Sequence, residues 1–209
     1  MSWPFAPLEP GAYGAICADP PWHFRARTAL QVGNWTSRRD AEKHYPVMGL
    51  EEIKALPVKR LAAADCHLFL WTTGPNLPAS FEVISSWGFR YSGIAFTWVK
   101  LRRSFDAMQL RALPMMEADL HVGLGLTTRK NAEFCLLARR GNCRRAAKNV
   151  REVILAPVRE HSRKPEEFRA RVEQYVGPGI RIAELFSRES RPGWDCWGAE
   201  AGKFDRAAA

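Results

Sequence analysis

The fold is decided by the stretch Gly14-Ala15-Ile16-Cys17-Ala18-Asp19-Pro20-Pro21-Trp22. Its first five residues carry no charge, and such a short apolar run is typical of a strand buried on both faces of a sheet. Asp19 follows this run directly. It is therefore expected at the carboxyl end of a buried strand, which is where α/β proteins bind their ligands.

Similar apolar runs recur along the chain and predict further buried strands. These runs are His67–Trp71, Ile94–Val99, Ala132–Ala138 and Ile180–Phe186. Helical patterns lie between them, over 49–64 with a break at Pro57, over 77–87, and from Pro165 to Gly177. This alternation predicts an α/β fold of Rossmann type, with a mixed, mostly parallel sheet flanked by helices. For residues 132–139 an antiparallel edge hairpin is an open alternative.

Two long stretches, 23–46 and 101–130, fit neither a helical nor a strand period. Both are rich in arginine, and the first also contains Phe24 and Trp35. Long aperiodic segments in a compact domain are usually functional or disordered. We therefore expect a single domain over 1–209, with both stretches forming basic substrate-binding loops at the mouth of the site.

The composition favours a polyanionic partner. The chain of 209 residues has 31 Lys and Arg against 22 Asp and Glu, which gives a formal net charge of +9. Such a surplus points to nucleic acid first and to an anionic membrane second. No membrane span or signal peptide is predicted, and the five scattered cysteines suggest reduced thiols in the cytoplasm. The five histidines do not cluster, so no metal site is predicted.

The tetrapeptide Asp19-Pro20-Pro21-Trp22 suits chemistry on a nucleobase amine. Such an amine is a poor nucleophile because its lone pair is delocalised into the ring. Two acceptors for its N–H bonds, the Asp19 carboxylate and the Pro20 carbonyl, would free that lone pair. Trp22 would offer a face on which a flipped base can stack.

Further blocks follow the tetrapeptide in a fixed order. They are His44-Tyr45-Pro46, Leu68-Phe69-Leu70-Trp71, Phe96-Thr97-Trp98-Val99-Lys100, Thr127–Glu133, Ser162–Glu166, Glu184–Arg188 and Gly193–Gly198. With these blocks the chain resembles, from about Ala15 to Glu200, the S-adenosylmethionine-dependent N6-adenine methyltransferases with an Asp-Pro-Pro-Trp signature. That family includes the enzyme that makes N6-methyladenosine in messenger RNA. The resemblance implies a circularly permuted class I methyltransferase fold, with the catalytic strand first and the cofactor strand last.

The resemblance also implies roles for individual residues. Asp19, Pro20, Pro21 and Trp22 would hold the target base, together with Tyr45, Trp71, Glu133, Lys100, Arg25 and Arg38. S-adenosylmethionine would be bound by Lys164, Glu184, Phe186, Arg188, Ser190, Ala199 and Glu200. Among these, Lys164 would face the cofactor's carboxylate, and Glu184 would accept hydrogen bonds from the ribose. No metal is implied.

The sequence departs from the family pattern near its end. Ala199 stands where the family has an asparagine, and Ser190 stands where the messenger-RNA enzyme has a histidine. These differences bear on cofactor affinity more than on the type of reaction.

Several residues have plainer explanations. Trp71 is either only a core residue, since large aromatics are mostly buried for packing, or part of the pocket wall. Glu184 lies in an apolar strand, where an unpaired carboxylate would be costly, and this favours a ligand role. The acid-free basic run Arg139–Arg151 is either a solvated turn or a strip that follows phosphates.

DNA is the favoured substrate. The same reaction on RNA, and a non-catalytic nucleic-acid-binding subunit of the same fold, are the alternatives. The sequence does not distinguish a monomer from a homodimer.

Overall fold

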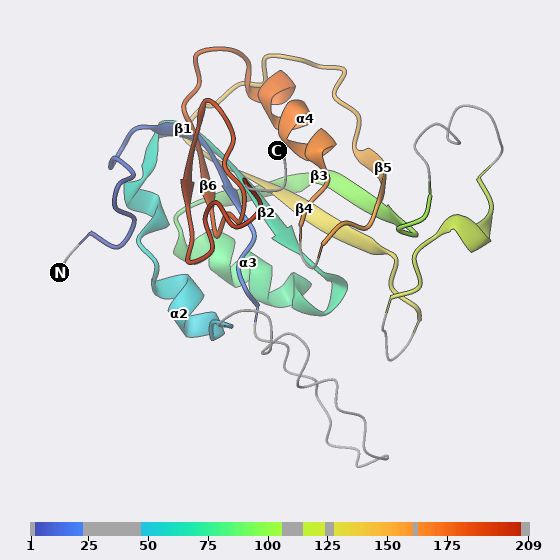
Figure 1. Cartoon of the computed structure of the whole chain (residues 1–209). Coiled ribbons are helices and arrows are strands. Elements are labelled where there is room, and N and C mark those ends of the chain that lie inside the picture. Colours follow the sequence, from blue (N-terminus) through green and yellow to red (C-terminus); the bar gives the residue numbers. More distant parts are fainter. Residues whose placement is uncertain (1–2, 23–46, 106–114, 124–127, 161–162, 206–209) are drawn as a thin grey trace.

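The computed structural model describes residues 3–22, 47–105, 115–123, 128–160 and 163–205. In this part of the chain seven strands form one sheet in the order β5-β3-β4-β2-β1-β6-β7 (Figure 1). The strands are β1 (Tyr13–Ala18), β2 (Ala62–Thr72), β3 (Arg90–Leu101), β4 (Ala132–Arg140), β5 (Val153–Pro157), β6 (Ile182–Leu185) and β7 (Trp194–Trp197). Strand β4 runs antiparallel to its neighbours β2 and β3, and the other six strands share one direction.

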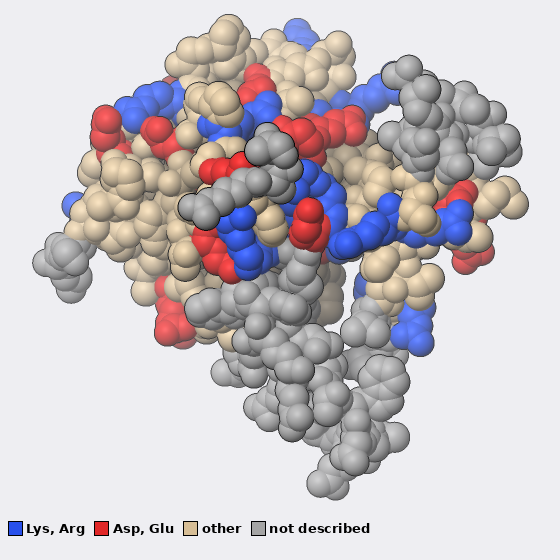
Figure 2. Space-filling view, in the orientation of Figure 1, with Lys and Arg blue, Asp and Glu red and all other residues tan. Residues whose placement is uncertain are grey.

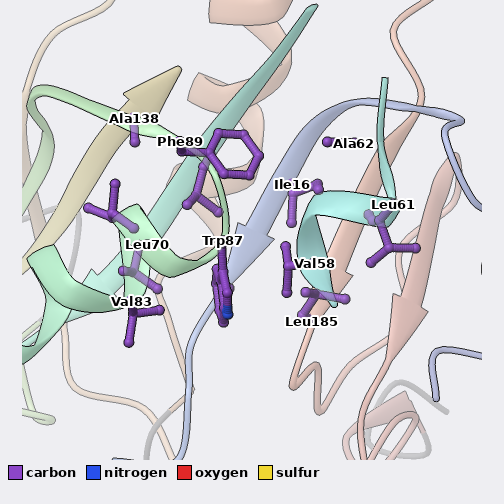
Figure 3. Close-up of a cluster of buried hydrophobic side chains, with 14 of the residues drawn as sticks. Ile16, Val58, Leu61, Ala62, Leu70, Val83, Trp87, Phe89, Ala138 and Leu185 are labelled. Carbon is purple, nitrogen blue, oxygen red and sulfur yellow. The ribbon is translucent and has the colours of Figure 1, made fainter. Parts of the chain in front are cut away.

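Helices cover both faces of the sheet (Figure 1). Helices α2 (Leu50–Ala55) and α3 (Leu77–Ser86) pack on one face, and α4 (Glu166–Val176) packs on the other. Alternate residues of β1 serve the two sides, as strand geometry requires. Ile16 lies in the core beneath α2 and α3, part of which Figure 3 shows, whereas Cys17 lies in the core beneath α4.

The predicted α/β architecture of Rossmann type is confirmed. Each of the five apolar runs forms a strand, and the helices predicted over 77–87 and after Pro165 are present. The pattern over 49–64 is shorter than expected, because α2 ends at Ala55 and β2 already begins at Ala62. The predicted break of the helix at Pro57 is confirmed, since a separate 3-10 turn covers Val58–Arg60.

The alternative of an antiparallel edge hairpin at 132–139 is wrong about the edge. Strand β4 is antiparallel, but it lies inside the sheet between β2 and β3. Strands β5 and β7 were not predicted. Each is short, and β7 has Asp195 and Cys196 between two tryptophans rather than a continuous apolar run.

The parallel strands bring several chain segments to one edge of the sheet. Strands β1, β2, β3 and β6 end at this edge, and β4 begins there because it runs the other way. We call it the carboxyl edge. It receives Asp19 after β1 and Lys100 and Glu133 at the adjoining ends of β3 and β4. No helix in the described ranges is long and apolar enough to cross a membrane.

Candidate functional site

Backbone hydrogen bonds fix the turn that carries Asp19. The Asp19 N–H donates to the carbonyl of Leu185 on β6 over 3.4 Å. The Pro20 carbonyl accepts from the Trp22 N–H at 2.8 Å, and the Pro21 carbonyl accepts from the Met48 N–H at 2.9 Å. A carbonyl oxygen has two lone pairs, so the Pro20 oxygen can accept one more hydrogen bond.

The indole of Trp22 is buried rather than presented to a ligand. Its side chain belongs to the core beneath α2 and α3, the residue is 8% exposed, and its Nε1 donates to the Trp71 carbonyl at 3.2 Å. The stacking face that we predicted at Trp22 is therefore not accessible in this structure. The ring instead ties the turn after β1 to the end of β2.

Four charged side chains form a chain across the carboxyl edge. The Nζ of Lys164 lies 2.8 Å from Oδ2 of Asp19 and 3.1 Å from Oε2 of Glu133. The other carboxylate oxygen of Glu133 lies 2.5 Å from Nζ of Lys100. Two acids and two bases alternate, so the group is close to neutral as a whole.

This alternation sets the protonation states of the buried members. Burial by itself disfavours the charged form of Glu133, but Lys164 and Lys100 outweigh it and lower the pKa of Glu133 to about 2. Burial likewise disfavours the ammonium of Lys164, but Asp19 and Glu133 raise its pKa well above the usual value. At neutral pH Glu133 and Lys164 are therefore both ionised.

A cavity opens beside Asp19, between the ends of β1 and β6 and the start of α4. It measures about 40 Å³ inside the protein and about 500 Å³ when its open mouth is counted. Its walls carry acids, bases and aromatic rings: Asp19, Glu184, Glu189, Arg163, Lys164, Arg169, Arg188, Trp71, Phe168, Phe186 and Phe204. The inner volume holds little more than a water molecule. A larger ligand must occupy the mouth or displace the side chains that close it.

A second group of ion pairs forms one wall of this cavity. The Nη2 of Arg169, on α4, lies 2.9 Å from Oε2 of Glu184, and its Nη1 lies 3.0 Å from Oε2 of Glu189. Glu189 also pairs with Arg163. The sequence favours a ligand role for Glu184 because an unpaired carboxylate in an apolar strand would be costly. In the structure Arg169 pairs with this carboxylate. The burial of Glu184 by itself therefore does not indicate a ligand role. Burial still raises the pKa of Glu184, against the opposing effect of Arg169.

The backbone after β6 is constrained. Phe186 has φ +62°, in the left-handed region that side-chain-bearing residues rarely adopt. Behind it, the backbone of Ser187 passes so close to Gly198 that a Cβ there would meet the Ser187 oxygen at 2.6 Å. The chain is therefore held in a strained turn that places Phe186 on the cavity wall.

The structure brings together only part of the predicted set. Cavity-lining residues from that set are Asp19, Trp71, Lys164, Glu184, Phe186 and Arg188, and Glu133 and Lys100 adjoin them through ion pairs. Ser190, Ala199 and Glu200 do not line the cavity, although Glu200 pairs with Arg188 at 2.6 Å. Tyr45, Arg25 and Arg38 lie outside the described residues. The first residues of the predicted loop 101–130 do leave the sheet at the carboxyl edge, as expected.

Trp71 both packs and faces the site. Its ring contacts Phe168 edge-on at 5.0 Å, the ammonium of Lys164 lies 5.3 Å from its centroid, and the residue is 2% exposed. Its indole N–H is buried and has no hydrogen-bond partner within the described part of the chain. The core role and the cavity role that we weighed as alternatives thus coincide in one residue.

Sequence reasoning missed Arg169, Arg163 and Glu189. A signal for Arg169 was available, because it shares the apolar side of its helix with Val172 and Val176 and is itself buried. A charge on an apolar helix face needs an opposite charge nearby. Arg163 and Glu189 carry no comparable local signal, since only the fold brings them together.

The charge on this side of the molecule is mixed. Figure 2 shows basic and acidic side chains next to one another in the middle of the view, not one uniform basic surface. The cavity wall is mixed in the same way, with three acids and four bases among its residues.

Comparison with known proteins gives consistent matches. The profile of the MT-A70 family matches residues 13–200. The Type II methyltransferase M.MunI from Mycoplasma sp is 31% identical over 208 residues, which cover 94% of this chain and 81% of that protein. The N(6)-adenine-specific methyltransferase METTL4 of Mus musculus is 28% identical, with 92% of this chain and 38% of the relative covered. The N(6)-adenosine-methyltransferase MT-A70-like of Arabidopsis thaliana is 29% identical, with 88% and 23% covered.

Proposed function

Because the chain belongs to the MT-A70 family, it is an adenine-N6 methyltransferase, and we propose that S-adenosylmethionine is its methyl donor and DNA its substrate. The observation that carries the proposal is the position of Asp19 and the Pro20 carbonyl. Both stand at the carboxyl edge, beside a cavity lined by acids, bases and aromatic rings.

The two acceptors suit the chemistry of the target amine. A carboxylate and a carbonyl that accept its two N–H bonds localise the nitrogen lone pair, which is otherwise spread into the purine ring. The Pro20 oxygen is positioned by its hydrogen bond from Trp22 and keeps a second lone pair. No strong base is required, since the amine becomes acidic once it is methylated. We propose that Asp19 and Pro20 perform this step and that Glu133 lies beside the base.

The donor set of the cavity fits the proposed cofactor. S-adenosylmethionine has a carboxylate, an ammonium, a ribose diol and an adenine ring, and when bound it supplies an electrophilic methyl group on a sulfonium. Lys164 and Arg188 suit the carboxylate and the ribose, and Glu184 suits hydroxyl donors. Phe186 and Phe204 offer apolar surface for a ring.

This assignment gives Lys164 two tasks. In the structure the ammonium of Lys164 pairs with Oδ2 of Asp19. This ion pair occupies one of the acceptor atoms that the target amine needs. If Lys164 turns to an incoming carboxylate, Oδ2 of Asp19 can accept a hydrogen bond from the amine instead, while Glu133 keeps Lys100 as its partner. We therefore propose that cofactor binding prepares the acceptor site.

DNA is favoured over RNA by the match with a type II methyltransferase over 81% of that protein's length. Other relatives are named as adenosine methyltransferases, so RNA is the alternative that must be tested. The five free thiols fit the proposed cytoplasmic location.

The test is a methylation assay with methyl-labelled S-adenosylmethionine and oligonucleotides of matched sequence in DNA and RNA form. We expect label on adenine N6, with DNA preferred by at least tenfold. Preference for RNA would overturn the substrate assignment and leave the reaction standing. Calorimetry with S-adenosylmethionine tests the remaining alternative, since a non-catalytic subunit would neither bind the cofactor nor transfer label.

A further inference from the structure

The basic run Arg139–Arg151 lies away from the cavity described above. It contains six Lys and Arg and no acid, and it forms the connection from β4 to β5. Since β4 is antiparallel, it ends at the edge where the parallel strands begin, with Arg140 opposite Cys66. The connection then passes the end of α4, where the Ala146 N–H donates to the Tyr175 carbonyl at 2.8 Å. The methyl-transfer site therefore does not use these charges.

A second cavity opens at this amino edge of the sheet. Its volume is about 440 Å³, and its lining includes His67 and Asp65 of β2, Asn142, Cys143 and Arg144 of the basic connection, and Ile180 before β6. Gly14 lines the second cavity and Asp19 lines the first, and these two residues lie about 17 Å apart along β1 and its extension, at about 3.3 Å per residue.

His67 is a buried hydrogen-bonding group without a partner. The residue is 3% exposed, and its Nε2 makes no hydrogen bond within the ranges that the structure describes. Burial and the nearby Arg139 lower the pKa of His67 to about 4, so the imidazole is neutral at pH 7. An unsatisfied buried polar atom is costly. The Nε2 atom is covered by the protein itself, so His67 contributes a neutral wall to the cavity and not a group within reach of a ligand.

The charges around this cavity favour an anion. Arg144 lines it and Arg145 is the next residue, and neither pairs with a carboxylate in the described part of the chain. The acid at the rim, Asp65, already accepts the Asn142 N–H at 2.7 Å. The thiol of Cys143 donates to the Cys66 carbonyl at 3.5 Å.

We propose that this second cavity binds a phosphate group, with Arg144 as its counter-charge and Asn142 as a hydrogen-bonding group. The phosphate belongs either to the backbone of a nucleic acid or to a free nucleotide. For the first source the inference takes nucleic acid as partner from the proposed function. A duplex that reaches both cavities would span about five base-pair steps of 3.4 Å.

The first experiment measures binding of a labelled 20-nucleotide oligothymidine, which contains no adenine for the methyl-transfer site. Arg144→Ala should weaken binding about five- to tenfold and reduce the slope of log affinity against log salt by about one. Lys54→Ala removes an equal charge on α2, where Lys54 pairs with Glu51 and Glu82, and should leave both quantities unchanged.

The second experiment needs no variant and so does not depend on folding of a mutant. Alkylation of Cys143 in the wild-type chain is followed by mass spectrometry, with the half-buried Cys196 as internal reference. If oligothymidine protects Cys143 and thymidine monophosphate does not, the site binds the nucleic-acid backbone. If thymidine monophosphate protects Cys143 as well, the site binds free nucleotides. A Cys143 that neither probe protects overturns the proposal, even if Arg144→Ala weakens binding.

Methylation of an adenine-containing tetramer, whose three steps of about 3.4 Å are too short to reach both cavities, is measured in parallel. Arg144→Ala should leave its rate unchanged, and a lower rate would contradict the separation of the two sites. Failure of the wild-type chain to methylate this tetramer would contradict the proposed function and not the second cavity.

Discussion

The ammonium of Lys164 lies 2.8 Å from a carboxylate oxygen of Asp19, so the residue proposed to hold the cofactor and the residue proposed to hold the target amine are ion-paired. Lys164 also reaches Glu133 at 3.1 Å. Each of these three side chains thus has an oppositely charged partner, which offsets the cost of holding charges partly buried at the carboxyl edge.

Replacing Asp19 should abolish most of the activity. Asp19→Ala removes an acceptor that acts in the transition state, and we expect turnover to fall about two to three orders of magnitude. Cofactor affinity should change less than tenfold. Single-turnover methylation and calorimetry measure the two quantities. Glu82→Ala, which removes an exposed acid on α3, is the matched control, and activity of Asp19→Ala within fivefold of wild type would contradict the assignment.

Lys164 should matter for cofactor affinity. Lys164→Ala removes the cation proposed to face the carboxylate and leaves Asp19 and Glu133 without the charge that separates them. We expect the dissociation constant for S-adenosylmethionine to rise about tenfold or more, a loss of about 1.4 kcal/mol or more. Lys164→Arg should restore part of it. Unchanged calorimetric affinity in the alanine variant would remove Lys164 from the proposed cofactor site.

Arg169 should be needed for stability. Arg169→Ala leaves the buried carboxylate of Glu184 without its partner at 2.9 Å, and such uncompensated burial costs about 3–5 kcal/mol. The double variant Arg169→Ala/Glu184→Gln should recover part of the loss, because it removes the stranded charge. Urea unfolding of the four members of this cycle measures the coupling, and additive effects would show that the pair does not interact.

The left-handed backbone at Phe186 predicts an unusual order of stability. Phe186→Gly and Phe186→Ala both remove the ring, but only alanine keeps a Cβ at φ +62°. Glycine should therefore be more stable than alanine by about 1 kcal/mol, the reverse of the order at ordinary positions. Thermal unfolding of the two variants decides, and a more stable alanine variant would mean that the turn relaxes.

Glu133 should make the fold sensitive to acid. Its pKa is lowered from 4.5 to about 2 in the folded chain, so the unfolded chain binds the proton more readily. This contribution is present above about pH 4.5 and is lost as the pH falls toward 2. Glu133→Gln should flatten the fall of unfolding free energy between pH 5 and pH 2, measured by urea titration. An equally steep fall in that variant would assign the acid sensitivity to other carboxylates.

Much of the fold and part of the site followed from local patterns. The apolar run before Asp19 predicted a strand inside the sheet, because a strand with no polar face has to be covered on both sides. It also predicted that Asp19, which follows the run, lies at the carboxyl edge. Pro165 and the acids after it marked the start of α4. Ordered motif blocks indicated the family, which the match over residues 13–200 confirms.

Other features depended on contacts between distant segments. The burial of Trp22 in the core, the pairing of Glu184 with Arg169, and the interior position of β4 follow from sheet order and register. Local periodicity does not encode these, because a strand pattern states which faces are apolar and not which strand lies beside it.

The residues themselves thus determined the elements, the reactive tetrapeptide and the surplus of positive charge. Where that charge lies was decided by the tertiary structure alone. The antiparallel direction of β4 carries Glu133 to the carboxyl edge and Arg140 to the opposite edge, so one strand places an acid at the methyl-transfer site and starts the basic run at a second cavity. The direction of β4 is fixed by its hydrogen bonds to β2 and β3, which only the folded sheet provides.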